Sequence, residues 1–390
     1  MRILKKNWSK EKLESLCTIT SGGTPSKSIG DYWTDGTIPW LRSECCKDEV
    51  VHKAEDYISE IGLRNSSAKV FKAETTLIAL VGATIGKTAF LSFDSATNQN
   101  VCGLYPTNKE KLFPRFLFYA CQAFYNHYFG GYSGFKMANQ TFIKKLEIPL
   151  PSLEEQMQIS TIFHLIEISI EHVEIQERSF KLLWLKLIDG FVNERPSFGN
   201  ILMDKNLLTV TYGDVTEKLM RRIDPISYGI EKIVAGENLE SEDFKIRTWQ
   251  IVGEGYLGPA FHVLFKPGDI LYGSRRTYLK KVAMANFEGV CANTTYVIRA
   301  KEKFLLQDLL KHIMLSDRFT KYSIGVSKGS TNPYINWKDL DNFTFQVPDI
   351  ETQIKITKVL DDVVNIIENL KAQQVQLRSL KQNLLNEILG

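Results

Sequence analysis

PLPSLEEQ at positions 149–156 opens a stretch with helical periodicity that continues to about Phe191, and the same kind of stretch occurs a second time. The second copy begins VPDIETQ at 347–353 and continues to Leu389. A shift of 197 positions places Pro151 on Pro348 and Gln156 on Gln353. The chain is therefore organised around a long helix that follows a proline and is present twice.

Both copies carry apolar residues in two rows that repeat every seven positions, which is typical of a coiled coil. The predicted seam residues of the first copy are Ile159, Phe163, Ile166, Ile170, Val173, Glu177, Phe180, Trp184 and Leu187. Those of the second copy are Ile356, Leu360, Val363, Ile367, Leu370, Gln374, Leu377 and Leu384.

A helix of nearly forty residues is about 60 Å long and cannot bury such a stripe by itself. The matched length and heptad register of the copies predict that they pair with each other as an antiparallel coiled coil. Glu177 and Gln374 are polar residues near the middle of the seam, where a polar residue usually fixes register. Two unrelated amphipathic helices, each on its own domain, are the alternative.

Length and composition are those of a soluble globular protein. The chain has 390 residues, of which 44% are hydrophobic and 24% charged, enough for two or three domains. No apolar run approaches the eighteen residues that would span a bilayer, and residues 1–8 contain no apolar segment of signal-peptide length. We therefore expect a cytoplasmic protein without a membrane partner.

The cysteines and histidines contain no known metal or disulfide pattern. The six cysteines include no C-x-x-C and no framework spacing, and the six histidines form no H-E-x-x-H. The adjacent pair Cys45-Cys46 lacks the four ligands of a tetrahedral metal site. We expect no metal, no catalytic residues and no cofactor bound by this chain.

Positive charge is concentrated outside the two helices. Residues 1–150 contain nineteen basic and fourteen acidic residues, a net charge of +5, and residues 196–348 contain twenty and seventeen, a net charge of +3. Residues 151–195 have four basic and eight acidic residues, and residues 349–390 have five and six. Because nucleic acid attracts basic surfaces, this distribution favours DNA binding by the two globular segments.

The globular segments look like copies of one another. In the first, a predicted buried strand at 75–81 is followed by a glycine loop and a second strand, and residues 266–283 repeat this pattern. The start of the chain, residues 8–16, is amphipathic, and Ser9 is a candidate helix N-cap. The predicted domains are a globular domain at 1–150, a helix at 151–195, a second globular domain at 196–348 and a second helix at 349–390. The predicted fold class is α+β, with two mixed α/β domains.

The glycine loop GATIGKT at 82–88 superficially resembles a nucleotide-binding P-loop. It has three residues between its glycines where the Walker pattern requires four, and the residues after Lys87 favour a strand rather than a helix. A nucleotide-binding enzyme that uses Gly82 to Thr88 is therefore a minor alternative. A self-contained methyltransferase is another, suggested by TNPY at 331–334, which lacks the second proline of the Asn-Pro-Pro-Tyr signature.

The order of motifs resembles the DNA-specificity subunit of type I restriction–modification systems over nearly the whole chain. The motifs that carry the resemblance are TSGGTP (20–25), IPWLR (38–42), LVGATIGK (80–87), TNQ (97–99), IPLPSLEEQ (148–156), GDILY (268–272), KGST (328–331) and VPDIETQ (347–353). The second copy departs from the pattern in the loop after its buried strand, where RRTYLK at 275–280 replaces VGATIG at 81–86.

The resemblance implies two target-recognition domains that each bind one half of a bipartite, asymmetric site in double-stranded DNA. It implies that the helices set the spacing of the half-sites and dock two methyltransferase subunits, and that restriction/translocase subunits complete the complex. S-adenosylmethionine, ATP and Mg²⁺ would belong to those partners. A coiled-coil adaptor without a DNA role remains the alternative from a different class.

The candidate DNA-binding residues are polar or basic residues of the predicted loops. They are Thr20, Lys27, Arg42, Ser43, Thr84, Lys87, Tyr132, Lys136, Arg275, Arg276, Tyr278, Lys280 and Lys328. Arg275 and Arg276 are the strongest candidates, because a bidentate arginine on guanine is the commonest specific contact. The alternative for these arginines is contact with phosphate alone.

Overall fold

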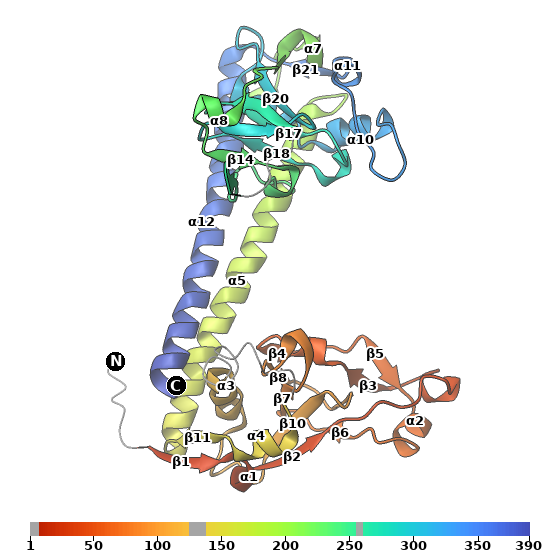
Figure 1. The fold of residues 1–390 in the computed structure, drawn as a ribbon, viewed down its shortest axis with the longest axis vertical. Helices are drawn as coiled ribbons and strands as arrows, with labels where there is room; N and C mark the ends of the chain where they lie inside the picture. Colours follow the sequence, from red (N-terminus) through yellow and green to blue (C-terminus); the bar gives the residue numbers. More distant parts are fainter. Residues whose placement is uncertain (1–7, 125–137, 255–259) are drawn as a thin grey trace. The chain divides into compact units, whose positions relative to one another are not determined.

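The computed structural model describes residues 8–124, 138–254 and 260–390 (Figure 1). The chain divides into two compact units, the first formed by residues 1–173 and 372–390 and the second by residues 174–371. Two forty-residue helices, α5 (Leu153–Val192) and α12 (Ile350–Leu389), contribute to both units.

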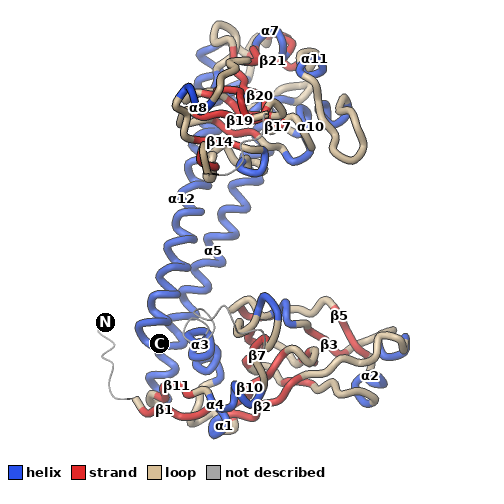
Figure 2. Tube along the Cα trace, in the orientation of Figure 1, coloured by secondary structure: helices blue, strands red, loops and turns tan. Residues whose placement is uncertain are grey.

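Within its described residues, the first unit contains three sheets and several short helices (Figure 2). Its elements before α5 are β1 (Ser9–Lys12), α1 (Leu13–Leu16), β2 (Cys17–Ser21), η1 (Gly30–Tyr32), β3 (Ile38–Leu41), η2 (Ser43–Cys45), β4 (Glu49–Val51), β5 (Asp56–Ile58), α2 (Glu60–Arg64), β6 (Val70–Phe71), β7 (Thr76–Ala79), η3 (Gly82–Thr84), β8 (Thr88–Leu91), β9 (Ser95–Thr97), β10 (Val101–Pro106), α3 (Pro114–Phe124), α4 (Gln140–Lys145) and β11 (Glu147–Leu150).

The sheets of the first unit are mixed. Their strand orders are β2-β10-β7-β8-β4, β5-β3-β9-β6 and β1-β11, and the pairs β4–β8 and β3–β9 are parallel. All four residues of β7 and of β8 are buried, as expected for short apolar strands covered on both faces. The antiparallel β7–β8 pair confirms the predicted strand–loop–strand around the glycine loop.

The second unit also contains three sheets. Its elements between the long helices are α6 (Gly199–Leu202), β12 (Leu208–Thr211), α7 (Tyr212–Val215), β13 (Thr216–Leu219), α8 (Pro225–Tyr228), β14 (Lys232–Val234), η5 (Gly236–Asn238), β15 (Gln250–Ile251), β16 (Phe261–Phe265), β17 (Ile270–Gly273), η6 (Thr277–Leu279), β18 (Val282–Met284), β19 (Gly289–Ala292), β20 (Thr295–Ala300), α9 (Gln307–Ile313), α10 (Asp317–Gly325), α11 (Trp337–Leu340) and β21 (Thr344–Val347).

The topology of the second unit repeats that of the first. Its strand orders are β13-β20-β17-β18, β15-β14-β19-β16 and β12-β21, and β14–β19 is parallel like its counterpart β3–β9. Among the described strands, β4 of the first unit has no counterpart in the second. The internal duplication inferred from the sequence is therefore also a duplication of sheet topology.

Within each unit, part of α5 packs against part of α12, and the two helices run in opposite directions (Figure 1). In the first unit, Phe163 near the start of α5 shares a core with Ile388 near the end of α12. In the second unit, Trp184 near the end of α5 shares a core with Leu360 near the start of α12. This confirms the predicted fold class, two mixed α/β domains that are each followed by a long helix of an antiparallel pair.

Side-chain caps fix where both long helices begin. The hydroxyl of Ser152 accepts from the backbone N–H of Glu155, and the Glu155 carboxylate accepts from the N–H of Ser152, which together form a capping box. At the second helix, the carboxylate of Asp349 accepts from the N–H of Thr352. These bonds satisfy N–H groups that a helix start leaves without an intrahelical acceptor.

The start of the chain differs from the sequence-based expectation of a helix. Residues Ser9–Lys12 form strand β1, which pairs antiparallel with β11, and α1 is a single turn that follows it. The partner strand lies more than 130 residues away, so tertiary pairing overrides the local amphipathic pattern.

Candidate nucleic-acid interface

The loop that joins β17 to β18 in the second unit exposes three of the candidate DNA-binding side chains. Arg275, Arg276 and Tyr278 are exposed, and 51% of the tyrosine surface is accessible. Neither guanidinium makes an ion pair or a side-chain hydrogen bond with any described residue. None of the five side-chain N–H donors of either arginine is therefore used within the described part of the chain.

The backbone of this loop is unusual at two positions that are not glycine. Arg276 and Lys280 have φ angles of +50° and +47°, and they flank the 3-10 turn η6 between them. A left-handed conformation costs an L-residue about 1–2 kcal/mol and persists where the surroundings hold it. Here the N–H of Arg276 donates to the carbonyl of Pro333 at 2.7 Å.

Pro333 belongs to a second loop that lies directly against the first. The N–H of Lys328 donates to the carbonyl of Tyr334 at 2.8 Å, and the N–H of Tyr334 donates to the carbonyl of Lys328 at 2.9 Å. These reciprocal bonds close a hairpin at residues 328–334, and Tyr334 also forms a β-bridge with Arg275. Residues 274–281 and 328–334, here called the paired loops, therefore form one continuous surface.

Lys280 and Lys328 differ from the two arginines because both have carboxylate partners. The Nζ of Lys280 lies 2.6 Å from Asp317 and 3.5 Å from Glu242, and only 14% of the lysine side chain is exposed. Burial alone would lower the pKa of Lys280, but pairing with Asp317 and Glu242 raises it. The Nζ of Lys328 lies 3.6 Å from Asp339, although this lysine stays exposed.

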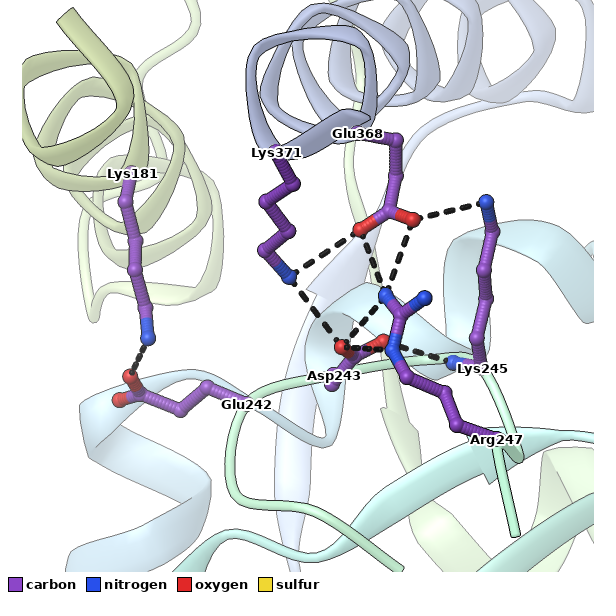
Figure 3. A network of polar contacts seen from close by, with 7 residues as sticks. All are labelled: Lys181, Glu242, Asp243, Lys245, Arg247, Glu368 and Lys371. Atoms are coloured by element: carbon purple, nitrogen blue, oxygen red, sulfur yellow. Dashed lines mark hydrogen bonds and ion pairs between the residues drawn. The ribbon is translucent and has the colours of Figure 1, made fainter. Parts of the chain in front are cut away.

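Glu242 connects the first of the paired loops to helix α5. Its carboxylate lies 2.9 Å from the Nζ of Lys181 on α5 (Figure 3). The same carboxylate lies 3.5 Å from the Nζ of Lys280. The N–H of Glu242 also donates to the carbonyl of Lys280 at 3.1 Å. Glu242 is therefore bound to the first of the paired loops through its backbone and side chain, and to helix α5 through an ion pair.

The neighbouring residues connect the same segment to helix α12. Asp243 accepts hydrogen bonds from Arg247 at 2.8 Å and from Lys371 of α12 at 3.2 Å (Figure 3). Glu368 of α12 accepts a hydrogen bond from Arg247 at 2.9 Å and forms an ion pair with Lys245 at 2.8 Å (Figure 3). Burial alone would raise the pKa of Glu368, but hydrogen bonds from Lys245 and Arg247 lower it to about 2.

In the first unit, candidate residues gather around η2 and η3. The hydroxyl of Thr84 donates to the carbonyl of Ser43 at 3.3 Å, which brings the two 3-10 turns together. Arg42, next to Ser43, is exposed, pairs with Asp56 at 2.7 Å and lies over the ring of Trp40. The side chain of Lys87, which precedes β8, is half-buried.

The other first-unit candidates lie on β2 and in the loop after it. Thr20 is half-buried on β2, and Lys27 is exposed with its Nζ 6.0 Å from the ring centroid of Trp33. Among the described residues, no hydrogen bond or ion pair joins these two to the group around Arg42. The two remaining candidates, Tyr132 and Lys136, lie outside the described residues.

Glycines hold the TSGGTP loop close to its neighbours. A Cβ on Gly22 would overlap Thr97, and a Cβ on Gly23 would overlap Ser67. The indole N–H of Trp40 donates to the carbonyl of Gly23 at 3.0 Å. Gly22 and Gly23 are therefore needed for packing, independently of any contact between the neighbouring polar residues and DNA.

None of the predicted seam residues is exposed. Nine are buried: Ile159, Phe163, Val173, Trp184, Ile356, Leu360, Val363, Ile367 and Leu370. Eight are half-buried: Ile166, Ile170, Glu177, Phe180, Leu187, Gln374, Leu377 and Leu384. Glu177 lies in the second unit and Gln374 in the first, so their role in register stays a prediction.

A buried histidine that sequence reasoning did not single out joins three helices of the second unit. Trp184 of α5 donates its indole N–H to Nδ1 of His312 on α9 at 3.1 Å, and Nε2 of His312 lies 2.9 Å from Asp361 of α12. Because indole can only donate, Nδ1 is the acceptor and Nε2 carries the proton. Burial lowers the pKa of His312, although Asp361 opposes this shift. No sequence pattern indicated this arrangement.

The described residues contain no group of three or more His, Cys, Asp or Glu side chains that could hold a metal ion. All six cysteines lie in described segments and carry free thiols. Lys87 is followed by strand β8, so the glycine loop lacks the helix N-terminus that holds phosphate in a P-loop. The helices within the described ranges include none long and apolar enough to cross a membrane.

Comparison with known families gives two matches along the chain. Residues 5–178 and 210–378 each match the model of the type I restriction modification DNA specificity domain. The chain is 24% identical to the type I restriction enzyme MjaIX specificity subunit of Methanocaldococcus jannaschii, over 99% of this chain and 93% of that protein. It is 21% identical to the MjaVIII specificity subunit of the same organism, over 98% and 92% of the two chains.

Two solved structures have a similar fold. The crystal structure of a type I restriction–modification S subunit from M. genitalium matches with a TM-score of 0.59 at 12% identity, covering 100% of this chain and 98% of that one. A chain from a structural analysis of complex assembly and conformational transition in the type I R-M system matches with a TM-score of 0.61 at 18% identity, covering 97% of both chains.

Proposed function

Because the chain belongs to the type I restriction–modification DNA specificity family, we propose that each of its two globular domains binds one half of a bipartite, asymmetric DNA site. The chain is the specificity subunit, a non-catalytic member of the type I complex. A coiled-coil adaptor without a DNA role, the alternative that the sequence left open, does not fit this family. The proposal concerns how the two domains divide the site.

The paired loops of the second unit are the observation that carries the proposal. Arg275 and Arg276 are exposed, have no carboxylate partner among the described residues, and lie on a loop held in a fixed conformation. Exposed arginines of this kind suit bidentate contact with the O6 and N7 of guanine in the major groove. Lys280 has the same charge but is held by carboxylates, which makes it a positioning residue for the loop.

The repeated topology supports a division of the site between two domains. The sheet orders of the two units correspond except for the additional edge strand β4 of the first, but the loop after the buried strand is VGATIG at 81–86 in one and RRTYLK at 275–280 in the other. Binding residues concentrate in loops held by a rigid scaffold. Two equal scaffolds with different loops suit two half-sites of different sequence.

The helices would set the gap between half-sites and dock two methyltransferase subunits. Both helices carry large apolar side chains on their exposed surface, including Leu165, Leu182, Ile354 and Val375. Exposed apolar side chains on a helix pair suit a protein partner. The restriction/translocase subunits would bind to the complex formed by this chain and the methyltransferase subunits. S-adenosylmethionine, ATP and Mg²⁺ would be bound by these partner subunits.

The test is to co-express the chain with its methyltransferase subunit and map methylated adenines across the host genome. A motif of two short half-sites separated by a fixed gap supports the proposal. A continuous palindrome, or no motif in a complex that has assembled, contradicts it. Replacing Arg275 and Arg276 together by Ala should change the half-site bound by the second domain and leave the other half-site unchanged.

A further inference from the structure

We propose that the hairpin at residues 328–334 is a second base-reading element of the second domain, which enters the major groove beside Arg275 and Arg276. The inference rests on the proposed function and extends it to named positions. The exposed tip of the hairpin, formed by Ser330, Thr331 and Asn332, specifies base pairs next to those contacted by the arginines.

The shape of the hairpin suits the major groove. The reciprocal hydrogen bonds between Lys328 and Tyr334 form one isolated β-bridge that closes a five-residue loop, with Gly329 in the left-handed region at φ +86°. The major groove of B-DNA admits protruding elements as large as an α-helix or a two-stranded ribbon, so it is wide enough for a loop of this size. Every residue from 328 to 332 is exposed, so nothing in the described chain covers the tip.

The side chains at the tip have the chemistry of base recognition. Asparagine can bind the N6 and N7 of adenine with two hydrogen bonds, and serine and threonine hydroxyls contact several bases. The side chains of Ser330, Thr331 and Asn332 make no hydrogen bond with any described residue. Residues 328–334 contain no acidic residue that would repel phosphate, and the nearby carboxylate of Asp339 is paired with Lys328 at 3.6 Å.

The root of the hairpin is buried and fixed to the arginine loop. Ile335 is fully buried, its N–H donates to the carbonyl of Ser274 at 2.9 Å, and its carbonyl accepts from the hydroxyl of Tyr296 at 2.7 Å. Together with the bond from the N–H of Arg276 to the carbonyl of Pro333, this links the two loops on both sides. The arginines and the tip are therefore presented as one preorganised edge.

Because the two loops form one fixed edge, the base pairs that they contact should be close together in the DNA. The positions specified by Asn332 and by Arg276 fall in the same half-site and within a few base pairs of each other. Losing the Asn332 contact should reduce discrimination at one position by about 5- to 150-fold, which corresponds to the 1–3 kcal/mol of a bidentate base contact.

The experiment uses the full chain assembled with its methyltransferase subunits and selects bound sequences from a randomised DNA pool. The variants are Asn332→Ala and Thr331→Ala at the tip, and Arg276→Gly, which removes the side chain but accommodates the left-handed backbone. Asn342→Ala, an exposed asparagine of the same unit outside the paired loops, is the matched control. Thermal unfolding of each variant verifies that the domain remains folded.

The expected result is a relaxed position in one half-site for Asn332→Ala, close to the position relaxed by Arg276→Gly, with the other half-site unchanged. If both tip variants keep the wild-type motif, or weaken binding to all sequences equally, the hairpin is not a base-reading element. If the wild-type complex itself selects no bipartite motif, the proposed function fails instead, so the two failures are distinguishable.

Discussion

Gln156 and Gln353 make the same three hydrogen bonds in the two halves of the chain. The amide group of Gln156 donates to the carbonyls of Lys111 and Pro151 and accepts from the N–H of Phe113. Gln353 donates to the carbonyls of Phe304 and Pro348 and accepts from the N–H of Leu306. Both glutamines are fully buried near the start of a long helix, so each one joins a globular domain to its helix.

Replacing Gln353 by Leu should lower the free energy of unfolding by about 3 kcal/mol. The substitution keeps the side-chain volume but leaves one N–H and two carbonyls buried without their partner. Urea unfolding of the purified chain measures the effect. Gln376→Leu, at an exposed position of the same helix, should change the free energy by no more than about 0.5 kcal/mol. Equal losses of unfolding free energy in the two variants would show that the hydrogen bonds of Gln353 do not stabilise the chain.

The buried His312 should make stability depend on pH near neutrality. Its pKa is lowered by burial, so as the pH falls below the ordinary value near 6.5 the unfolded chain takes up a proton more readily than the folded chain does. The free energy of unfolding should therefore fall as the pH decreases below about 6.5, by up to about 1.4 kcal/mol per pH unit for this one group.

Urea unfolding at pH 7, 6 and 5 checks this prediction. His312→Gln should be less stable than the wild type at pH 7 but should have a smaller slope with pH. His52→Gln, which changes an exposed histidine of the first unit, should keep the wild-type slope. An unchanged slope in His312→Gln would assign the pH dependence to other groups.

The Glu368 network should weaken in acid. The pKa of Glu368 is lowered to about 2, so its contribution is complete above the ordinary value near 4.5 and is lost as the pH falls toward 2. Glu368→Gln should lower stability at pH 7 by about 2 kcal/mol and reduce the loss of stability between pH 5 and pH 3. Thermal unfolding across this range measures both effects.

Glu351→Gln is the control. Glu351 also pairs with a lysine of α12, but its side chain is 80% exposed, so this variant should reproduce the wild-type curve of stability against pH.

Lys280 and Arg276 form a matched pair for separating positioning from DNA contact, since both are cations with φ near +50°. In binding titrations with matched and mismatched DNA, Arg276→Ala should weaken binding to the preferred sequence by about 1–3 kcal/mol and relax specificity at one base pair, as for the loss of one base contact. Lys280→Ala should leave specificity unchanged and should lower the thermal stability more than Arg276→Ala does, because it removes the ion pairs with Asp317 and Glu242. Relaxed specificity, or a reduced slope of log affinity against log salt, for Lys280→Ala would restore this lysine as a DNA contact.

Lengthening both long helices should change the gap between half-sites. Seven residues inserted after Val173 and after Leu370 keep the heptad register and add about 10 Å of helix. We expect a gap wider by about three base pairs, at about 3.4 Å per pair, with both half-sites unchanged. Mapping of methylated adenines in cells that express the variant complex measures the gap. Insertions of four residues, which shift the seam, should reduce assembly instead.

The long helices and the duplicated sheets were predictable because their signals are local or repeated. A heptad pattern over five heptads and a strand–glycine–strand pattern both appear in the sequence without any knowledge of distant contacts. Strand β1 was predicted wrongly as a helix because residues 9–12 take their conformation from pairing with β11, more than 130 positions away in the sequence. A periodic pattern of nine residues carries too little information to outweigh such pairing.

The sequence predicted which loops form the candidate interface, but it did not predict which of their side chains are exposed and which are paired. The sequence favoured Arg275 and Arg276 because of the chemistry of arginine but kept Lys280 as a DNA-binding candidate beside them. The structure exposes the arginines and places Lys280 against Asp317. Their difference depends on carboxylates 37 or more positions away and on two left-handed residues that are not glycine. The connection of His312 to Trp184 and Asp361 is likewise a product of packing between distant segments.

The pairing of β1 with β11 and of β12 with β21 has a consequence for how such chains can change over time. In each half, the strand that enters the globular domain lies hydrogen-bonded to the strand that leaves it, as Ser9 does with Leu150 and Leu208 with Val347. A domain whose two ends lie side by side can be exchanged for another of different length without disturbing the helix that follows. Recombination at these strand pairs would give a hybrid with one inherited half-site and one new one, so new specificities can arise by exchange of whole segments rather than by accumulated point mutations.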